Sequence, residues 1–187
     1  YRLTEIEIMF TTFHAGYCKI LAEAFHYRQT RRGGLPYTSH TNAVCSIASD
    51  IFSAHSSKLA IPNGLDLIKC VAHLHDAMED SGIASSVLSA MLDIKIKDIG
   101  FVDRVIKNLL LLTHDDSTPY DLYISDILNS AYEDPIALIV KLADMKHNME
   151  CCMSELKAGP NPKSAKQLEK YSRNYNLLAE EFHALTK

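Results

Sequence analysis

Leu65-Asp-Leu-Ile-Lys-Cys-Val-Ala-His-Leu-His-Asp-Ala-Met-Glu-Asp80 is the stretch that decides the fold. Its first half is apolar on almost every face of a helix, which predicts burial on most sides. Its second half carries His75, Asp76, Glu79 and Asp80 within about two helical turns. Three carboxylates this close repel one another, and a buried carboxylate without a partner is costlier still. We therefore expect a compensating cation, most simply a divalent metal held by the adjacent histidine and aspartate, with the other two carboxylates free for proton transfer.

The rest of the chain is also helical in pattern, because every strong apolar period is that of a helix. Gly82 should end the central helix in the left-handed conformation, and Asp134-Pro135 should start a later helix as its cap and first residue. The expected helices span residues 6–27, 39–55, 65–80, 84–92, 99–112, 120–131, 136–149 and 163–186. The sequence predicts an all-α bundle of roughly eight helices in a single domain, residues 1–187.

The composition narrows the class of protein. The chain has 187 residues, 47% of them hydrophobic and 22% charged, which is typical of one globular domain. The sequence has no run of about 18 apolar residues, so we expect no membrane span. The net charge of −4 argues against general binding to nucleic acid but leaves room for a small anionic ligand. Five cysteines without a CxxC pair, and a charged beginning without a leader, favour a cytoplasmic protein.

Metal-ligand residue types occur at three places in the sequence. His40 lies at a helix start, His75-Asp76 in the buried helix, and Asp144 in a second buried helix. Two imidazoles and two carboxylates would suit Mn²⁺, Fe²⁺ or Zn²⁺. The alternative is structural: His40 would be a cap, the His-Asp pair a buried hydrogen bond, and Asp144 the ion-pair partner of a neighbouring lysine.

Two further groups of residues suggest ligand binding. Arg28-Gln-Thr-Arg-Arg-Gly-Gly-Leu-Pro36 combines helix breakers with three arginines, which suits a phosphate or a nucleobase; the alternative is a solvated basic loop. His147 and Asn148 share the helix face of Asp144, because they are three and four residues further on. We expect His147 to be structural. We expect four other histidines to be ordinary surface residues, namely His14, His55, His114 and His183.

Three motifs follow one another in the chain. The first comprises His26, Gln29, Arg31-Arg32, Gly34, Pro36-Tyr37 and His40. The second is Leu74-His75-Asp76 with Glu79-Asp80, and the third is Lys141-Leu-Ala-Asp144 with His147-Asn-Met149. From about residue 24 to residue 149, in these motifs and their order, the chain resembles the HD-domain hydrolases of the RelA/SpoT type. These enzymes remove the 3′-pyrophosphate from the alarmones ppGpp and pppGpp.

The resemblance implies a manganese-dependent guanosine-3′,5′-bis(diphosphate) 3′-pyrophosphohydrolase that needs no organic cofactor. The implied residues are His40, His75, Asp76 and Asp144 for Mn²⁺, Glu79 and Asp80 for catalysis, and Arg31, Arg32 and Asn148 for the nucleotide. The catalytic pair would orient and deprotonate the attacking water. The first arginine would stack on guanine, the second would lie near the phosphates, and the asparagine would contact the sugar. The chain is shorter than the long family members, which implies a stand-alone small alarmone hydrolase.

The sequence departs from the family pattern at several positions. Arg28 replaces a usual glycine, and Cys151 stands where a threonine is common. These departures leave open an HD phosphohydrolase that acts on another nucleotide. A non-catalytic alarmone-binding module is the other alternative, and the intact Glu79-Asp80 pair speaks against it.

Overall fold

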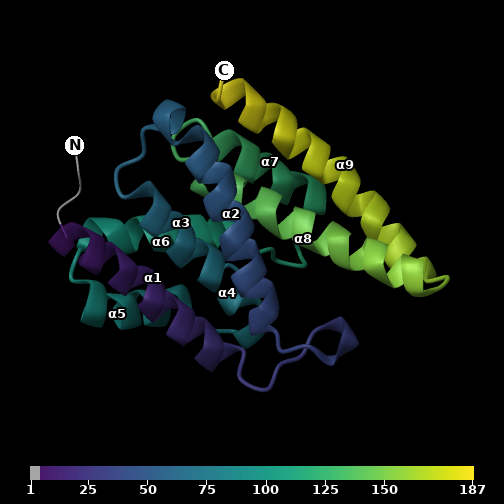
Figure 1. Ribbon diagram of the computed structural model, residues 1–187, viewed down its shortest axis with the longest axis horizontal. Helices are drawn as coiled ribbons and strands as arrows, with labels where there is room; N and C mark the ends of the chain where they lie inside the picture. Colours follow the sequence, from purple (N-terminus) through teal and green to yellow (C-terminus); the bar gives the residue numbers. More distant parts are fainter. Residues whose placement is uncertain (1–4) are drawn as a thin grey trace.

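The computed structural model describes residues 5–187, and side chains from residue 13 onward except that of Arg32. Within this range the chain forms nine α-helices, one short 3-10 helix and no strand, which confirms the all-α prediction (Figure 1). The elements are α1 (Glu5–Phe25), η1 (Arg32–Gly34), α2 (Thr38–Leu59), α3 (Gly64–Leu74), α4 (Ala77–Ser81), α5 (Ser85–Ile96), α6 (Ile99–Leu112), α7 (Tyr120–Ser130), α8 (Ile136–Ala158) and α9 (Pro162–Leu185). In the described part of the chain, none of these helices combines the length and the apolar composition that crossing a bilayer requires.

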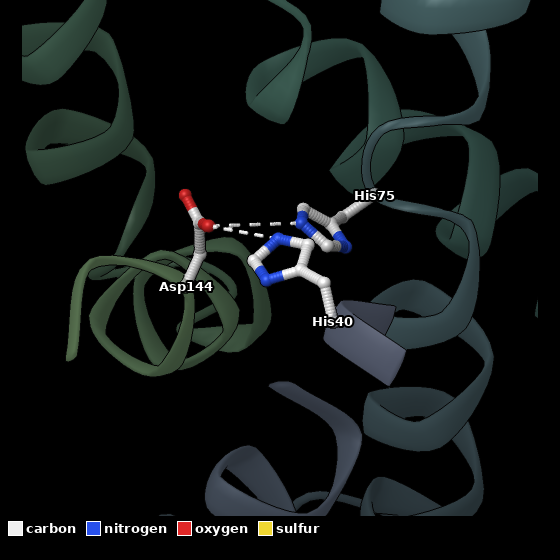
Figure 2. Close-up of side chains that lie close together, drawn as sticks. All are labelled: His40, His75 and Asp144. Atoms are coloured by element: carbon white, nitrogen blue, oxygen red, sulfur yellow. Dashed lines mark ion pairs between the residues drawn. The ribbon is translucent and has the colours of Figure 1, made fainter. Parts of the chain in front are cut away.

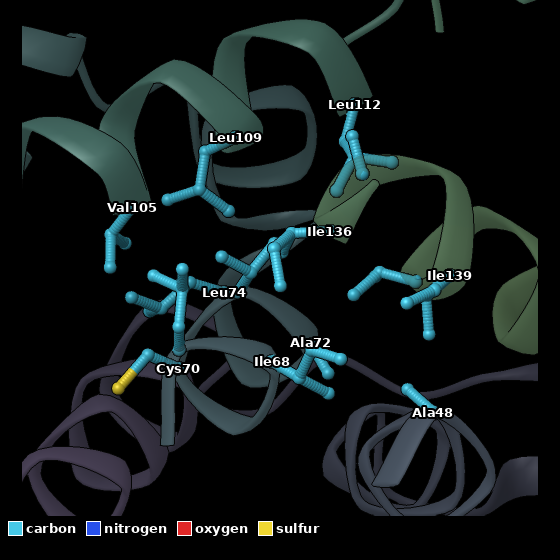
Figure 3. Close-up of a cluster of buried hydrophobic side chains, with 14 of the residues drawn as sticks. Ala48, Ile68, Cys70, Ala72, Leu74, Val105, Leu109, Leu112, Ile136 and Ile139 are labelled. Carbon is cyan, nitrogen blue, oxygen red and sulfur yellow. The ribbon is translucent and has the colours of Figure 1, made fainter. Parts of the chain in front are cut away.

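Helix α3 lies at the centre of the core, as its composition predicted. Nine of its eleven residues are buried, and it packs against α1, α2, α6 and α8. Figure 3 shows Ile68 and Leu74 of α3 meeting Leu109 of α6 and Ile136 and Ile139 of α8. Full burial of one such side chain stabilises the fold by about 1.5–3 kcal/mol. The central helix is therefore fixed on several sides, which makes its C-terminal end a rigid place for a site.

The central helix is not continuous, contrary to the prediction of one helix from residue 65 to residue 80. Helix α3 ends at Leu74, and α4 begins at Ala77. Asp76 has φ −99° and ψ −1°, in the sparsely populated bridge region where many active-site residues lie. The apolar period continues through this break, so periodicity alone could not reveal it. Gly82 ends α4 with φ +69°, as expected.

Helices α8 and α9 form a long hairpin along one side of the molecule (Figure 1). Helix α8 continues to Ala158, well beyond the predicted end at residue 149. The Asn161 side chain accepts a hydrogen bond of 3.1 Å from the Ser164 N–H, and Pro162 occupies the first turn, so α9 has a capped start. Helix α2 packs against α8 from the other side. This arrangement holds the middle of α8 opposite the end of α3.

Candidate metal centre

The structure brings together four side chains that are far apart in the sequence. His40 comes from the first turn of α2, His75 and Asp76 from the junction between α3 and α4, and Asp144 from the middle of α8. Figure 2 shows both imidazoles pointing at the Asp144 carboxylate. The Asp144 Oδ1 atom lies 3.3 Å from His40 Nε2 and 3.8 Å from His75 Nε2. One ligand atom from each of these three residues lies within 4.8 Å of the others, a spacing that a single metal ion can bridge.

Asp76 lies at the fourth corner of this cluster. Its Oδ2 atom is 3.0 Å from His75 Nε2 and 3.4 Å from His40 Nε2. Consecutive side chains on a regular helix do not face each other. The break between α3 and α4 is therefore what allows His75 and Asp76 to converge. The Tyr37 hydroxyl donates a hydrogen bond of 2.6 Å to Asp76 Oδ2 and so holds this carboxylate in place.

Hydrogen bonds fix which nitrogen of His40 faces the cluster. An Arg31 guanidinium nitrogen lies 3.3 Å from His147 Nδ1, and arginine can only donate. His147 Nδ1 is therefore an acceptor, and His40 Nδ1, 2.8 Å away, must carry the proton that it donates there. Burial first, and then His40 and Arg31, lower the pKa of His147 to about 4, so this ring is neutral. His40 Nε2 is therefore the nitrogen that faces the carboxylates, and in the neutral ring it is the one with the lone pair that a metal ion can take.

The same reasoning applies to His75. Its Nδ1 atom lies 2.8 Å from the Ala72 carbonyl oxygen, so this nitrogen donates. Its Nε2 atom is buried and faces only carboxylate oxygens, of Asp76 at 3.0 Å and of Asp144 at 3.8 Å. Burial opposes a charge on this ring, but Asp76 and Asp144 outweigh burial and raise the pKa of His75 to about 10. The cluster thus attracts a positive charge at the point where two nitrogens and two carboxylates meet, and this donor set fits Mn²⁺, Fe²⁺ or Zn²⁺.

A second layer of contacts fixes Asp144. Lys141 Nζ lies 3.0 Å from its Oδ2 atom, so the lysine pairing of the structural alternative is present in addition to the cluster. Asn148 Nδ2 donates to Oδ1 at 2.6 Å, and Arg31 in turn donates to Asn148 Oδ1 at 2.6 Å. Although burial works against ionisation, Lys141 and the two imidazoles hold the pKa of Asp144 well below its usual range. The carboxylate is therefore ionised and rigidly oriented, as a metal ligand requires.

A cavity of about 250 Å³ lies over the cluster. Glu79 lines it from α4, and Glu79 Oε2 accepts a hydrogen bond of 3.2 Å from the His114 backbone N–H. Glu79 is exposed in part, and its partial burial raises its pKa, which brings the carboxylate closer to the range of a general base. Asp80 is also exposed and is not among the residues that line the cavity. Its carboxylate interacts with the Tyr37 hydroxyl and raises the pKa of Tyr37, although burial and Asp76 raise that pKa more.

A second cavity of about 260 Å³ adjoins the first, and Arg31 lines both. The second cavity is more apolar and is lined in part by Leu35, His147 and Cys151. The Cys151 sulfur lies 3.9 Å from His147 Nε2. Arg31 therefore stands between an apolar hollow and a polar one. The Arg32 side chain, a predicted phosphate ligand, lies outside the described residues.

Several residues that line the first cavity were not singled out from the sequence. They are His114, Tyr120, Tyr123, Lys170 and Tyr171. The prediction that His114 is an ordinary surface residue was wrong, because its ring is half-buried against Tyr120 and Tyr123. His147 was expected to be structural, and it contacts His40. No spacing in the sequence links α7 and α9 to the cluster, so only their packing on α8 reveals these residues.

Comparisons with known proteins relate the chain to parts of much longer ones. No family model matches the chain. Over 130 residues, 69% of its length, it is 30% identical to a probable GTP pyrophosphokinase of Mycobacterium leprae (strain TN), of which the match covers 14%. Over 149 residues, 78% of its length, it is 29% identical to the probable GTP diphosphokinase RSH3, chloroplastic, of Oryza sativa subsp. japonica, of which the match covers 19%. The chain thus spans 14% and 19% of these relatives and is similar to one part of each.

Proposed function

We propose that the chain is a manganese-dependent HD-type hydrolase of the RelA/SpoT family that removes the 3′-pyrophosphate of ppGpp and pppGpp. The observation that carries this proposal is the buried cluster in which two imidazole nitrogens face two carboxylates beside an acid-lined cavity. The relatives are named as a GTP pyrophosphokinase and a GTP diphosphokinase, and these names support a guanine nucleotide as the class of substrate. The residues His40, His75, Asp76 and Asp144 would hold the ion.

The hydrolysis requires a water oxygen to bond to the phosphorus next to the ribose 3′ oxygen. The bond between that phosphorus and the 3′ oxygen breaks, the 3′ oxygen takes up a proton, and pyrophosphate leaves. Mn²⁺ would supply Lewis acidity, which polarises the water and neutralises charge on the phosphate oxygens. Glu79 is the preferred acceptor for the water proton, because it lines the cavity and burial raises its pKa. Asp80, next to the Tyr37 hydroxyl, is the proposed partner in orienting that water.

The two cavities suggest how a guanine nucleotide would lie. The apolar cavity beside Arg31 would take the base, on which the planar guanidinium can stack. The polar cavity over the cluster would then take the 3′-phosphates. Asn148, which bridges Arg31 and Asp144, lies between these two regions and is the proposed contact for the sugar. Arg32 remains a proposed phosphate ligand on the grounds of its sequence position.

The direct test is to incubate the manganese-loaded protein with ppGpp and to measure release of GDP and pyrophosphate. Glu79→Gln should retain the metal but lower kcat by about 10²–10⁴-fold, because it removes a general base. The matched control Glu180→Gln changes an exposed glutamate on α9 and should keep full activity.

Three outcomes would contradict parts of the proposal. Full activity of Glu79→Gln would remove Glu79 as the base. Hydrolysis of another nucleotide without release of GDP would change the substrate, an outcome that Cys151 in the apolar cavity makes worth testing. Binding of ppGpp without turnover would indicate a non-catalytic module.

A further inference from the structure

The wall of the first cavity formed by α7, α8 and α9 differs in charge from its acidic floor. Lys141 of α8 and Lys170 of α9 both line it, together with Tyr120 and Tyr171. The Lys170 ammonium group lies 3.4 Å from the centroid of the Tyr120 ring, which places a cation over an aromatic face. Two positive charges therefore lie at one wall of a cavity whose floor carries the Asp144 carboxylate.

The two lysines differ in how their charges are balanced. Lys141 is paired with Asp144 at 3.0 Å. Lys170 takes part in none of the ion pairs found in the described part of the chain. Lys170 is exposed in part; partial burial, followed by the like charge of Lys141, lowers its pKa, while Glu79 acts in the opposite direction. An anion in the cavity would reverse this balance.

The tyrosines at this wall can serve as hydrogen-bond donors to an anion. Burial raises the pKa of Tyr120 and of Tyr171, so both hydroxyls keep their protons at neutral pH. The Tyr123 hydroxyl already donates to the Leu112 carbonyl oxygen at 2.7 Å and supports the wall rather than the ligand. One ammonium group outside the ion pairs of the described residues, and two phenolic hydroxyls, thus line one side of the cavity.

We propose that Lys170, with Lys141 and the hydroxyls of Tyr120 and Tyr171, forms a subsite for inorganic pyrophosphate, the group that departs in the proposed reaction. The choice of anion rests on the proposed function. In the proposed pose, Arg31 and the apolar cavity lie where the guanine ring would bind, whereas Lys141 contacts the metal-site residue Asp144 directly. The side of the cavity that carries Lys141 and Lys170 is therefore placed to receive the two phosphates that leave as pyrophosphate. Charge-assisted contacts of this kind are strong for phosphate oxygens.

The test measures pyrophosphate affinity by isothermal titration calorimetry, with equal manganese in the cell and the syringe. Lys170→Gln should bind inorganic pyrophosphate about tenfold more weakly, the effect of losing one charged hydrogen bond worth roughly 1.4 kcal/mol. Lys170→Arg keeps the charge and should stay closer to the original chain. Lys163→Gln removes the same charge about two turns earlier on α9 and should leave the affinity unchanged. The affinity for GDP should not change in Lys170→Gln.

Unchanged pyrophosphate affinity in Lys170→Gln would overturn the subsite. An equal loss for GDP would also overturn it, because Lys170 would then serve the phosphates that stay on the nucleotide. Equal weakening in Lys163→Gln would show that the effect comes from net charge rather than from position, and it would also overturn the subsite. Because binding needs no turnover, the result is separate from the proposed function. A chain that binds pyrophosphate through Lys170 but does not hydrolyse ppGpp would keep the subsite and refute the proposed hydrolase.

Discussion

Two buried polar clusters in this molecule are built on opposite principles. In the first, Asp134 accepts bonds of 2.7 and 2.9 Å from the Arg104 guanidinium and one of 3.0 Å from Asn108 Nδ2. Asn108 Oδ1 in turn accepts from the Ala137 N–H at 2.9 Å. Donors and acceptors match, and the cluster joins α6 to the start of α8. In the second cluster, around Asp144, the Nε2 atoms of His40 and His75 face the carboxylates of Asp76 and Asp144 at 3.0–3.8 Å, and among the described residues no neutral donor lies between them.

The difference separates a structural network from a binding site. A closed network needs nothing further, because each buried polar atom already has a partner. The Asp144 cluster places two imidazole nitrogens against two carboxylates, so it needs a positive charge between them, from a proton on His75 or from a metal ion. Both clusters are buried and both contain an aspartate that burial would otherwise neutralise. Only the pattern of donors tells them apart, and the following variants test that distinction.

Asp144→Ala should have the largest effect, namely loss of manganese binding and of activity. In the original chain, manganese at about 100 times its Kd should stabilise the fold by about 2.7 kcal/mol. For a domain of this size that corresponds to a rise in Tm of about 5–10 °C. The variant should show no rise, which thermal denaturation with and without manganese would measure. Asp121→Ala removes an exposed carboxylate and should keep the full rise; an equal rise in Asp144→Ala would exclude Asp144 as a ligand.

Asp134→Ala should instead lower stability and leave manganese binding intact. It removes the partner of a buried network whose arginine is partly exposed, and we expect a loss of about 2–3 kcal/mol. Urea denaturation would measure it. Glu133→Ala is the control, because its pair with Lys107 is exposed and should contribute less than about 0.5 kcal/mol.

The pH dependence of this loss has a definite sign. Despite burial, Arg104 and Asn108 hold the pKa of Asp134 below its usual range. Its contribution is therefore fully present above the unfolded pKa of about 3.9 and is lost as the pH falls through the folded value. The stability difference between the original chain and Asp134→Ala should be constant from neutral pH to about pH 5 and should shrink below about pH 4. A difference that grows with acidification would contradict the assignment.

His147→Ala should weaken manganese binding by about 10–100-fold, the usual effect of losing a group that orients a ligand. The variant removes the acceptor that keeps the proton of His40 on Nδ1. Titration with manganese, followed by calorimetry, would measure the change. His183→Ala removes an exposed histidine and should bind like the original chain. Unchanged affinity in His147→Ala would mean that His40 keeps its tautomer without this contact.

Arg28→Gly should have the smallest effect, a small gain in stability. Arg28 has φ +63°, although it carries a side chain. The left-handed conformation costs a residue other than glycine about 1–2 kcal/mol, and glycine gives back about 0.5–1 kcal/mol in chain entropy. We expect a gain of about 0.5 kcal/mol in urea denaturation. Arg28→Ala keeps the strain and should bring no gain; an equal gain there would assign the effect to the guanidinium.

The sequence predicted the helices better than their interruptions. The bounds 99–112 of α6 agree with the structure, because its apolar period is long and Asp98 caps it. The break at His75 and Asp76 was missed, since the same apolar period runs through it. Asp134 was predicted as a helix cap; its carboxylate does accept a hydrogen bond of 3.4 Å from the Ile136 N–H, but its shorter bonds are to Arg104. Local patterns report which residues become helical but not how a buried side chain is satisfied.

The residues of the candidate site also divide into those that the sequence predicted and those that it did not. The four metal ligands could be predicted because each lies in or next to a strongly patterned helix and because their motifs resemble a family. Lys170 and His114 lay outside every motif. Lys170 reaches the cavity through the packing of α9 on α8, and His114 through the loop between α6 and α7, and no local spacing encodes either position. Arg28, noted in the sequence as an unusual residue for its position, has the positive φ that would suit glycine.

The origin of the cluster in two distant parts of the chain has a kinetic consequence. His40 and His75 belong to the early helices, whereas Asp144 belongs to the α8–α9 hairpin that covers them. An ion held among them would act as a reversible cross-link, and the hairpin could not separate without releasing it. The rate at which the ion dissociates would then limit the rate of unfolding. The lifetime of the protein against proteases in a cell would depend on the supply of that ion as much as on the packing of its core.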